Sequence, residues 1–430
     1  MCTAQRRGVC ACLRVDRPPR CRSAQRGRRP NRRRRLGNYY STIDDVFIIG
    51  AGATPCGRYL ETSPRELARQ AAEAALADAA LRPDQINAIV VGNAVAGLIG
   101  GQECIRGQAW LQGTELLGTP IFNVENACAS GSSAFHLACQ GIGSGTYEIA
   151  LVVGVEKLTH EDKARSFAAL EGALDVEAHP LEKGGRQRSI FMDIYASKAR
   201  RYLESHGATR EDLARVVSKN RAHARLNPVA QYREELTVDE VLSAREIVDP
   251  LTLPMCAPIG DGAAALVVTT RERARGRESA VRVAGTAGSS GKPGSGSAVE
   301  RAAQAAYEHA GIGPESIGIA EVHDAAASAE LEEIEHLGLA GSGEAFRLTN
   351  AGETSLGGAV PVNVSGGLIS RGHPVGATGT LQLYELTTQL RGRAGDRQVD
   401  PRPDFGVAQN GGGFIVDDVA AAMVTILAAA

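Results

Sequence analysis

The chain has 430 residues, enough for two or three domains or one large α/β body, and its 22% charged and 4% aromatic residues are ordinary for a globular α/β enzyme. No apolar run is long enough to cross a bilayer, which argues against an integral membrane protein. Thirteen arginines and one acid, Asp16, give residues 1–40 a charge of about +12, so the rest of the chain carries about −14. An acidic body argues against nucleic acid as its main partner.

Residues 1–40 are predicted to form a disordered, Arg-rich extension outside the fold, because they offer little apolar surface to bury. They lack the apolar stretch of a secretory signal, and their composition fits a mitochondrial transit peptide poorly. A nucleic-acid-binding tail is a further alternative. Their four cysteines match no paired zinc-binding pattern, so no metal site is expected. The remaining cysteines are scattered through the body: Cys56, Cys104, Cys128, Cys139 and Cys256. This spacing predicts reduced thiols and a cytoplasmic protein.

The body repeats one order of elements. Each half contains an apolar strand, a helical capping box, an Ala-rich helix and a second strand. The strands and capping boxes lie at 46–50, 63–66 and 86–91 in the first half, and at 281–285, 297–300 and 317–322 in the second. This repetition predicts an α/β protein built from two equivalent halves, residues 45–275 and 278–430.

The likeness extends to residues that carry chemistry. Asn123-Val124 precedes a small-residue turn that contains Cys128, and Asn363-Val364 precedes a Gly-rich loop that contains His373. The two patterns therefore place Cys128 and His373 at equivalent loop-to-helix junctions. Residues 160–250 interrupt the first half with charged sequence of helical pattern, which predicts an inserted loop domain.

Three side chains are candidates for catalysis. Cys128 lies at a helix start, where unpaired N–H groups and the positive dipole end are expected to lower the thiol pKa and to hold an oxyanion. His373 is flanked by glycines and equivalent in position to Cys128, which makes it a candidate base for that thiol. His323 ends a buried strand beside Asp324 and is the third candidate.

Five motifs occur in the order seen in thiolases, and the chain resembles that family over roughly residues 45–430. The His-Asp pair and the inserted segment are most similar to the sterol-carrier-protein and archaeal acetoacetyl-CoA branch. The motifs are Asn126–Gly131 around Cys128, Asp261–Ala265, His323–Ala325, Gly372–Gly379 around His373, and Gly411–Gly413.

The resemblance implies a duplicated thiolase fold of five layers, α-β-α-β-α, with an inserted loop domain, in a homodimer or homotetramer. It implies that Cys128 accepts an acyl group from a coenzyme A thioester and that His373 activates the thiol. His323 would help hold the oxyanion of the second thioester. The N–H groups of Cys128 and of the Gly411–Gly412 turn would form the other oxyanion hole. Residues 160–260 would cradle coenzyme A, with no bound cofactor or metal.

The chain departs from the family where many thiolases carry a second cysteine that removes a proton from the α-carbon of the substrate. Gln409 or Asn410 stands before the terminal glycines, and no cysteine follows Cys256. Ala325 stands at the alternative position of that cysteine, and Ala257 replaces a serine that contacts the pantetheine arm in relatives. Because an amide cannot act as a base, the carbon–carbon step lacks its usual residue.

Three functions stay open. The first is an acyl-CoA C-acyltransferase that makes or cleaves a 3-ketoacyl-CoA, with a histidine in place of the missing base. The second acylates an already activated acceptor in natural-product biosynthesis. The third is a thiolase-like aldolase or subunit that works with a small zinc-containing OB-fold partner. Aldolase relatives tend to lose the cysteine and histidine that stand here at Cys128 and His373.

Overall fold

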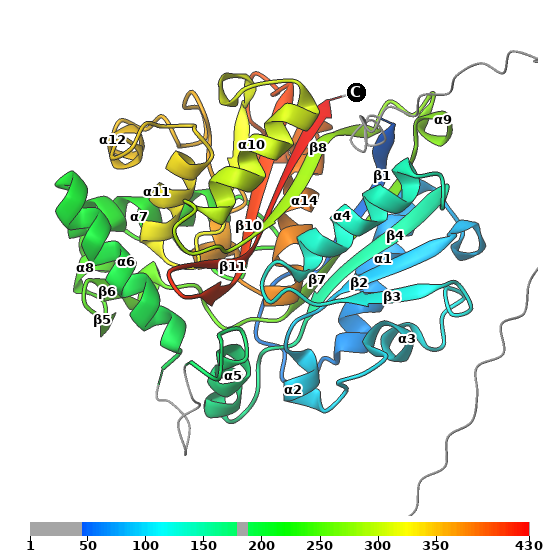
Figure 1. Ribbon diagram of the computed structural model, residues 1–430, viewed down its shortest axis with the longest axis horizontal. Helices are drawn as coiled ribbons and strands as arrows, with labels where there is room; N and C mark the ends of the chain where they lie inside the picture. The colour runs from blue at the N-terminus through cyan, green and yellow to red at the C-terminus, as the bar shows by residue number, and fades with distance from the viewer. Residues whose placement is uncertain (1–44, 179–187, 430) are drawn as a thin grey trace, which may run out of the picture. The chain divides into compact units, whose positions relative to one another are not determined.

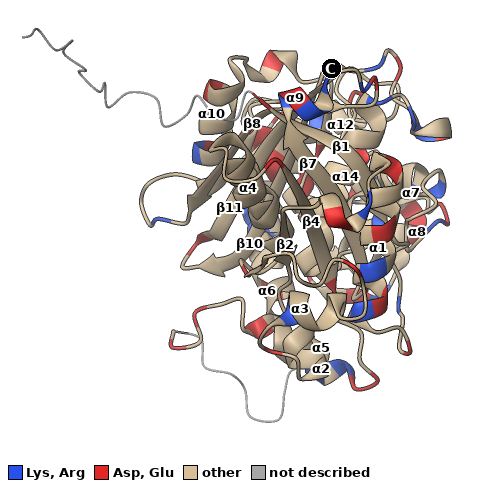
Figure 2. Cartoon of the chain, turned by 90° about the vertical axis from the view of Figure 1, so that its right-hand side faces the viewer, with Lys and Arg blue, Asp and Glu red and all other residues tan. Residues whose placement is uncertain are grey.

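The computed structural model describes residues 45–178 and 188–429. The extension predicted at residues 1–40 lies outside the described residues. Within them, no helix is long and apolar enough to span a membrane. Figure 2 shows the charged residues mainly on the helices and loops around the large sheet, whose strands carry few of them.

A nine-stranded sheet contains both halves of the chain. The first half contributes the order β2-β4-β7-β1, and the second repeats it as β9-β10-β11-β8. The two sets join where β1 pairs with β8 at only two positions, and β3 extends the first half at its edge. The strands are β1 (Val46–Ala53), β2 (Ala88–Gly92), β3 (Ile121–Val124), β4 (Ile149–Glu156), β7 (Gly262–Thr270), β8 (Val281–Ser290), β9 (Ile319–Glu321), β10 (Phe405–Ile415) and β11 (Asp418–Ala429).

Helices form three layers around these strands (Figure 1). Helices α1 (Pro64–Ala79) and α3 (Arg106–Leu111) cover the outer face of the first half, and α10 (Ala298–Ala310) with α11 (Ala327–His336) covers that of the second. Helices α4 (Ser130–Gly143) and α14 (Thr378–Leu390) lie between the halves and contact each other. The layers therefore follow the expected α-β-α-β-α order.

Equivalent glycines let the outer helices approach the strands closely. A Cβ on Gly50 of β1 would lie 2.3 Å from the Ala75 carbonyl oxygen of α1, and one on Gly285 of β8 would lie 2.4 Å from the Ala306 oxygen of α10. Such distances are far inside van der Waals contact, so neither position accepts a side chain without moving a helix. The two halves thus share strand order and the same close helix–strand packing.

The inserted segment leaves the first half after β4 and returns to it at β7. Its elements are α5 (Lys163–Glu171), α6 (Ile190–His206), α7 (Arg210–Arg225), α8 (Val238–Ser243), β5 (Glu246–Val248) and β6 (Leu251–Thr252). Although it belongs to the first half in sequence, α6 and α7 pack on α11, α12 (Ala345–Asn350) and α13 (Gly367–Arg371) of the second half. Figure 1 shows these green helices beside the yellow α11. The segment therefore extends over the junction between the halves.

Candidate active site

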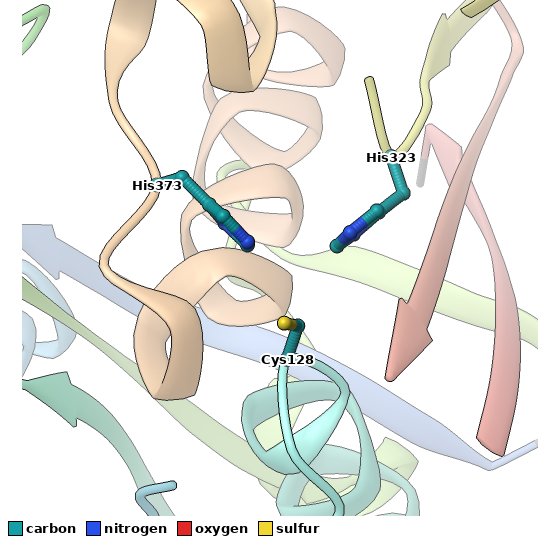
Figure 3. A group of neighbouring side chains, drawn as sticks. All are labelled: Cys128, His323 and His373. Carbon is teal, nitrogen blue, oxygen red and sulfur yellow. The ribbon is translucent and has the colours of Figure 1, made fainter. Parts of the chain in front are cut away.

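Cys128, His323 and His373 converge at one point of the structure. One ligand atom of each side chain lies within 4.8 Å of the others. Figure 3 shows the three side chains pointing toward one another from different elements. The centroids of the two imidazole rings are 5.1 Å apart, with an interplanar angle of 86°. A thiol and two imidazoles are also ligands that zinc accepts, and among the described residues no other such group of three appears.

A strained turn presents Cys128 at the start of α4. Ala127 has a positive φ of 48°, which is uncommon for a residue with a Cβ. The Ala129 N–H donates to the Asn126 carbonyl at 2.9 Å, and the Asn126 N–H donates to Ser130 Oγ at 2.9 Å. These bonds hold the turn in the geometry that exposes the sulfur to the site.

Burial decides the ionisation of the Cys128 thiol. It raises the thiol pKa to about 12, and the negative charge of Glu156 acts in the same direction. Hydrogen bonds from the N–H groups of Gly413 and Cys128 lower the pKa but do not offset burial. The helix-start N–H therefore lowers this pKa as expected, but desolvation outweighs it and the net pKa is raised.

The two histidines are neutral for the same reason. Burial lowers the pKa of His373 well below its usual range, with further contributions from His323 and Arg371. Burial also lowers the pKa of His323 to about 4. His373 Nδ1 lies 2.7 Å from Thr378 Oγ1, within the motif that opens α14. The resting site therefore contains a neutral thiol beside two neutral imidazoles.

His323 is held by the side-chain amides of Gln409 and Asn410. In the sequence, these residues were notable only because they stand where many thiolases have the second cysteine. Its backbone N–H donates to Gln409 Oε1 at 2.8 Å, and its Nδ1 lies 2.9 Å from Asn410 Nδ2. The Ser132 hydroxyl donates to Asn410 Oδ1 at 2.8 Å. The sequence gives one signal for the contact between Asn410 and His323: a polar residue stands where many thiolases have a reactive cysteine.

Asp324, the neighbour of His323, belongs to a buried hydrogen-bond network behind the site. It accepts hydrogen bonds from the Leu368 N–H at 2.6 Å and from Asn220 Nδ2 at 3.0 Å. Asn220 also donates to Glu330, whose other oxygen accepts from Lys219 at 2.6 Å. This buried network ties the strand end that carries His323 to α7 and α13.

The terminal glycines approach the cysteine from β10. Gly411 lines the cleft above the site, and the N–H of Gly413 reaches the Cys128 sulfur. Gly412 packs behind the turn, since a Cβ there would lie 2.1 Å from the Asn126 carbonyl oxygen. The sequence does not distinguish these three glycines, whereas the structure gives each a different contact.

A cleft of about 800 Å³ leads from this point to the surface, and most of its wall comes from residues 160–260. Aromatic residues of α6 and β10 form an apolar part of the wall beside Cys128: Phe191 and Tyr195 both contact Phe414, with ring centroids 5.9 and 5.6 Å away. Basic side chains also line the cleft, namely Arg58, Lys163, Arg188, Arg221 and Arg245. An apolar channel with basic groups suits an acyl thioester attached to phosphates.

Comparison with known proteins decides the family. The model "Thiolase, N-terminal domain" matches residues 46–272, and "Thiolase C-terminal domain-like" matches residues 289–428. The chain belongs to the thiolase family. Membership confirms the resemblance, and this thiolase is an acyl-CoA acyltransferase.

Individual relatives agree over most of the chain. The thiolase is 36% identical over 379 residues to the benzoylsuccinyl-CoA thiolase subunit BbsB of Thauera aromatica. This alignment covers 86% of this chain and 94% of the relative. The thiolase is also 36% identical over 378 residues to the acetyl-CoA acetyltransferase of Methanothermobacter thermautotrophicus, with 86% and 96% covered. Rat (Rattus norvegicus) sterol carrier protein 2 is 33% identical over 377 residues, with 82% and 67% covered.

Solved structures share the fold. The structure titled "Ltp2-ChsH2(DUF35) aldolase" matches with a TM-score of 0.76 and 25% identity, over 90% of this chain and 99% of that one. Human mitochondrial 3-ketoacyl-CoA thiolase matches with a TM-score of 0.68 and 17% identity, over 91% and 100%. The five-layered thiolase fold expected from the sequence is thereby confirmed.

Proposed function

We propose that this thiolase transfers an acyl group from a coenzyme A thioester to Cys128 and then to a carbon acceptor, making or cleaving a 3-ketoacyl-CoA. The observation that carries the proposal is the meeting of the Cys128 thiol, the His373 imidazole and the Gly413 N–H in one cleft. A nucleophile, a base and an oxyanion donor within reach of one another are the parts that acyl transfer requires.

The first half-reaction uses a thiol that is neutral at rest. His373 accepts the Cys128 proton as the sulfur attacks the thioester carbonyl, and the N–H groups of Cys128 and Gly413 stabilise the oxyanion. The bond to the coenzyme A sulfur then breaks, and that sulfur takes the proton from His373. His323 faces the same point and is assigned to the oxyanion of the second thioester. Gly412 packs behind this turn and Gly411 lines the cleft, so the donor from these glycines is assigned to Gly413.

Coenzyme A is assigned to the cleft lined by residues 160–260. Arg58, Lys163 and Arg245 are exposed where they line it, so they are available to phosphate groups. We divide the chain accordingly into halves at 45–275 and 278–430, with the inserted segment at 160–250 as the coenzyme A-binding part.

Acylation tests the proposal. The protein is incubated with acetyl-CoA and with longer acyl-CoAs, and the Cys128 peptide is examined for the mass of the acyl group. Cys128→Ser and His373→Gln are expected to abolish the adduct, whereas Cys104→Ser, which changes an exposed free cysteine, leaves it intact. No adduct with any acyl-CoA contradicts the proposal. Supplying a 3-ketoacyl-CoA with free coenzyme A then separates thiolysis from acylation of an activated acceptor.

Partners are proposed on two grounds. The names of two similar proteins, a thiolase subunit and an aldolase with a DUF35 component, support an accessory protein. The zinc-containing OB-fold kind of partner is what the family resemblance implies. The edge strand β3 carries Phe122, 47% exposed, with exposed Leu117 and Leu137 in the same half. Exposed apolar side chains at and near a sheet edge support a homodimer or homotetramer. The free cysteines of the described chain support a cytoplasmic location.

A further inference from the structure

His323 and His373 face each other beside Cys128, and the missing second cysteine leaves open which of them takes the α-proton (Figure 3). We infer that Asn410 is a positioning residue that holds the proton of His323 on Nε2. His323 then donates a hydrogen bond into the site, and His373 is the base of both half-reactions. The assignment rests on the proposed function, because it concerns the carbon–carbon step that follows acylation of Cys128.

A single threonine proton decides which nitrogen of His373 is free. The Thr378 hydroxyl donates to the Pro374 carbonyl at 3.2 Å, and its Oγ1 also lies 2.7 Å from His373 Nδ1. We assign this one proton to the Pro374 carbonyl, which also accepts from the Ala377 N–H at 2.8 Å, and Oγ1 then accepts from Nδ1–H. Nε2 of the neutral imidazole is then unprotonated, so it is the atom that accepts a proton from Cys128 or from substrate.

The opposite arrangement holds at His323. Ser132 Oγ donates to Asn410 Oδ1 at 2.8 Å, which leaves Asn410 Nδ2 facing His323 Nδ1 at 2.9 Å. An amide nitrogen only donates, so Nδ1 is the acceptor and the proton of the neutral imidazole lies on Nε2. Reversing the amide would leave the Ser132 proton without an acceptor among the described residues. Such an orphaned donor is unfavourable where Ser132 is buried.

The surrounding packing keeps this chain of hydrogen bonds dry and fixed. Asn410 and Ser132 are 1% and 5% exposed, and His323 is 5% exposed. A Cβ on Gly379 would lie 1.9 Å from Ser132 Oγ and 2.7 Å from Asn410 Oδ1, so α14 leaves space for the pair only because this residue is glycine. Water therefore does not compete for the Asn410 amide, and its orientation is determined by the protein.

The two tautomers give the histidines different tasks in the second half-reaction. The first half-reaction ends with the proton on the departing coenzyme A thiol, so His373 Nε2 is free again. His373 removes the α-proton of the second acyl-CoA, and His323 Nε2–H donates to the enolate oxygen. The α-carbon attacks the Cys128 thioester, the new carbon–carbon bond forms, and the bond to sulfur breaks. The Cys128 thiolate then recovers the proton from His373.

Substitution by glutamine separates a donor from a base, because its amide reaches where imidazole Nε2 lies but does not take a proton. His323→Gln is expected to keep thiolysis of a 3-ketoacyl-CoA within about tenfold of wild type, whereas His323→Ala lowers it by about 10²–10³-fold, the usual loss of one oxyanion donor. Cys128 acylation by acyl-CoA is measured separately for each variant by the mass of its peptide. His373→Gln loses both half-reactions.

The tautomer itself is read by NMR of ¹⁵N-histidine protein, with the His323 signals assigned from the His323→Gln spectrum. Wild type is expected to show a proton on His323 Nε2 and none on Nδ1. Asn410→Asp offers only acceptors and moves a proton to Nδ1. The control is Thr425→Val, which removes a buried hydroxyl of β11 and leaves the His323 signals unchanged.

Two results overturn the inference: a wild-type proton on His323 Nδ1, or a His323→Gln enzyme that acylates Cys128 but loses thiolysis as fully as His323→Ala. Either result would make His323 the base. A wild-type protein that is never acylated would instead contradict the proposed function, and the NMR measurement still decides the tautomer in that case.

Discussion

Alkylation of Cys128 by iodoacetamide tests the electrostatic description of the site. The thiolate is the reactive form, and its fraction changes tenfold for each pH unit below the pKa. Burial raises this pKa from 9.0 to about 12. At pH 7 the thiolate fraction is then roughly 10⁻⁵, about a thousandfold less than for a thiol of ordinary pKa.

The expected result is an alkylation rate that rises about tenfold per pH unit from pH 7 to pH 10 with no plateau. Peptide mass spectrometry follows Cys128, and the exposed Cys104 provides an internal check that the reagent is active. His373→Gln should leave the profile unchanged, because burial rather than the imidazole sets the thiol pKa. The same variant should abolish acylation by acyl-CoA, where the imidazole must take the proton.

A plateau below pH 8 that disappears in His373→Gln would refute this reasoning. It would mean that Cys128 and His373 rest as a thiolate–imidazolium pair. The helix start and the imidazole would then outweigh burial, and the lowered pKa expected from local sequence would be right after all.

Three further substitutions test other parts of the structure. Gly412→Ala forces a Cβ against the Asn126 carbonyl and should slow Cys128 acylation by on the order of 10²-fold, measured by peptide mass, while an unchanged rate would refute the assigned contact. Arg245→Glu should raise KM for acyl-CoA by about three- to tenfold at low salt and less at high salt, with Arg245→Gln intermediate. Lys219→Met leaves the buried Glu330 carboxylate without its cation and should lower the free energy of unfolding by about 3–5 kcal/mol in urea titrations; a loss below about 1 kcal/mol would show that the network tolerates the charge.

Features that depend on local pattern and order could be predicted from the amino-acid sequence. Both predicted helix starts have a serine N-cap, with the Glu66 N–H donating to Ser63 Oγ at 3.2 Å and the Val299 N–H to Ser297 Oγ at 3.1 Å. The reciprocal bond of a full capping box, from the Ser297 N–H to Glu300, forms in the second half and not at Ser63. The repeated order of elements predicted the repeated strand order, and equivalent positions in it pointed to Cys128 and His373. Such features are readable because they arise from residues within a few positions of one another, or from two copies of one pattern.

The chemistry of the assembled site depends on contacts between residues that are far apart in the sequence. Desolvation in the assembled site and the charge of Glu156 raise the pKa of Cys128, where the local helix start alone predicts a fall. Asn410 contacts His323, which lies 87 residues away in the sequence. Without knowledge of this contact, Asn410 indicates only that the usual catalytic base is missing. Helices α6 and α7 of the inserted segment pack on the half to which they do not belong in sequence. Several distant segments together determine how buried a side chain is and which groups it hydrogen-bonds. Burial and these partners set the protonation state of Cys128 and the tautomers of the two histidines.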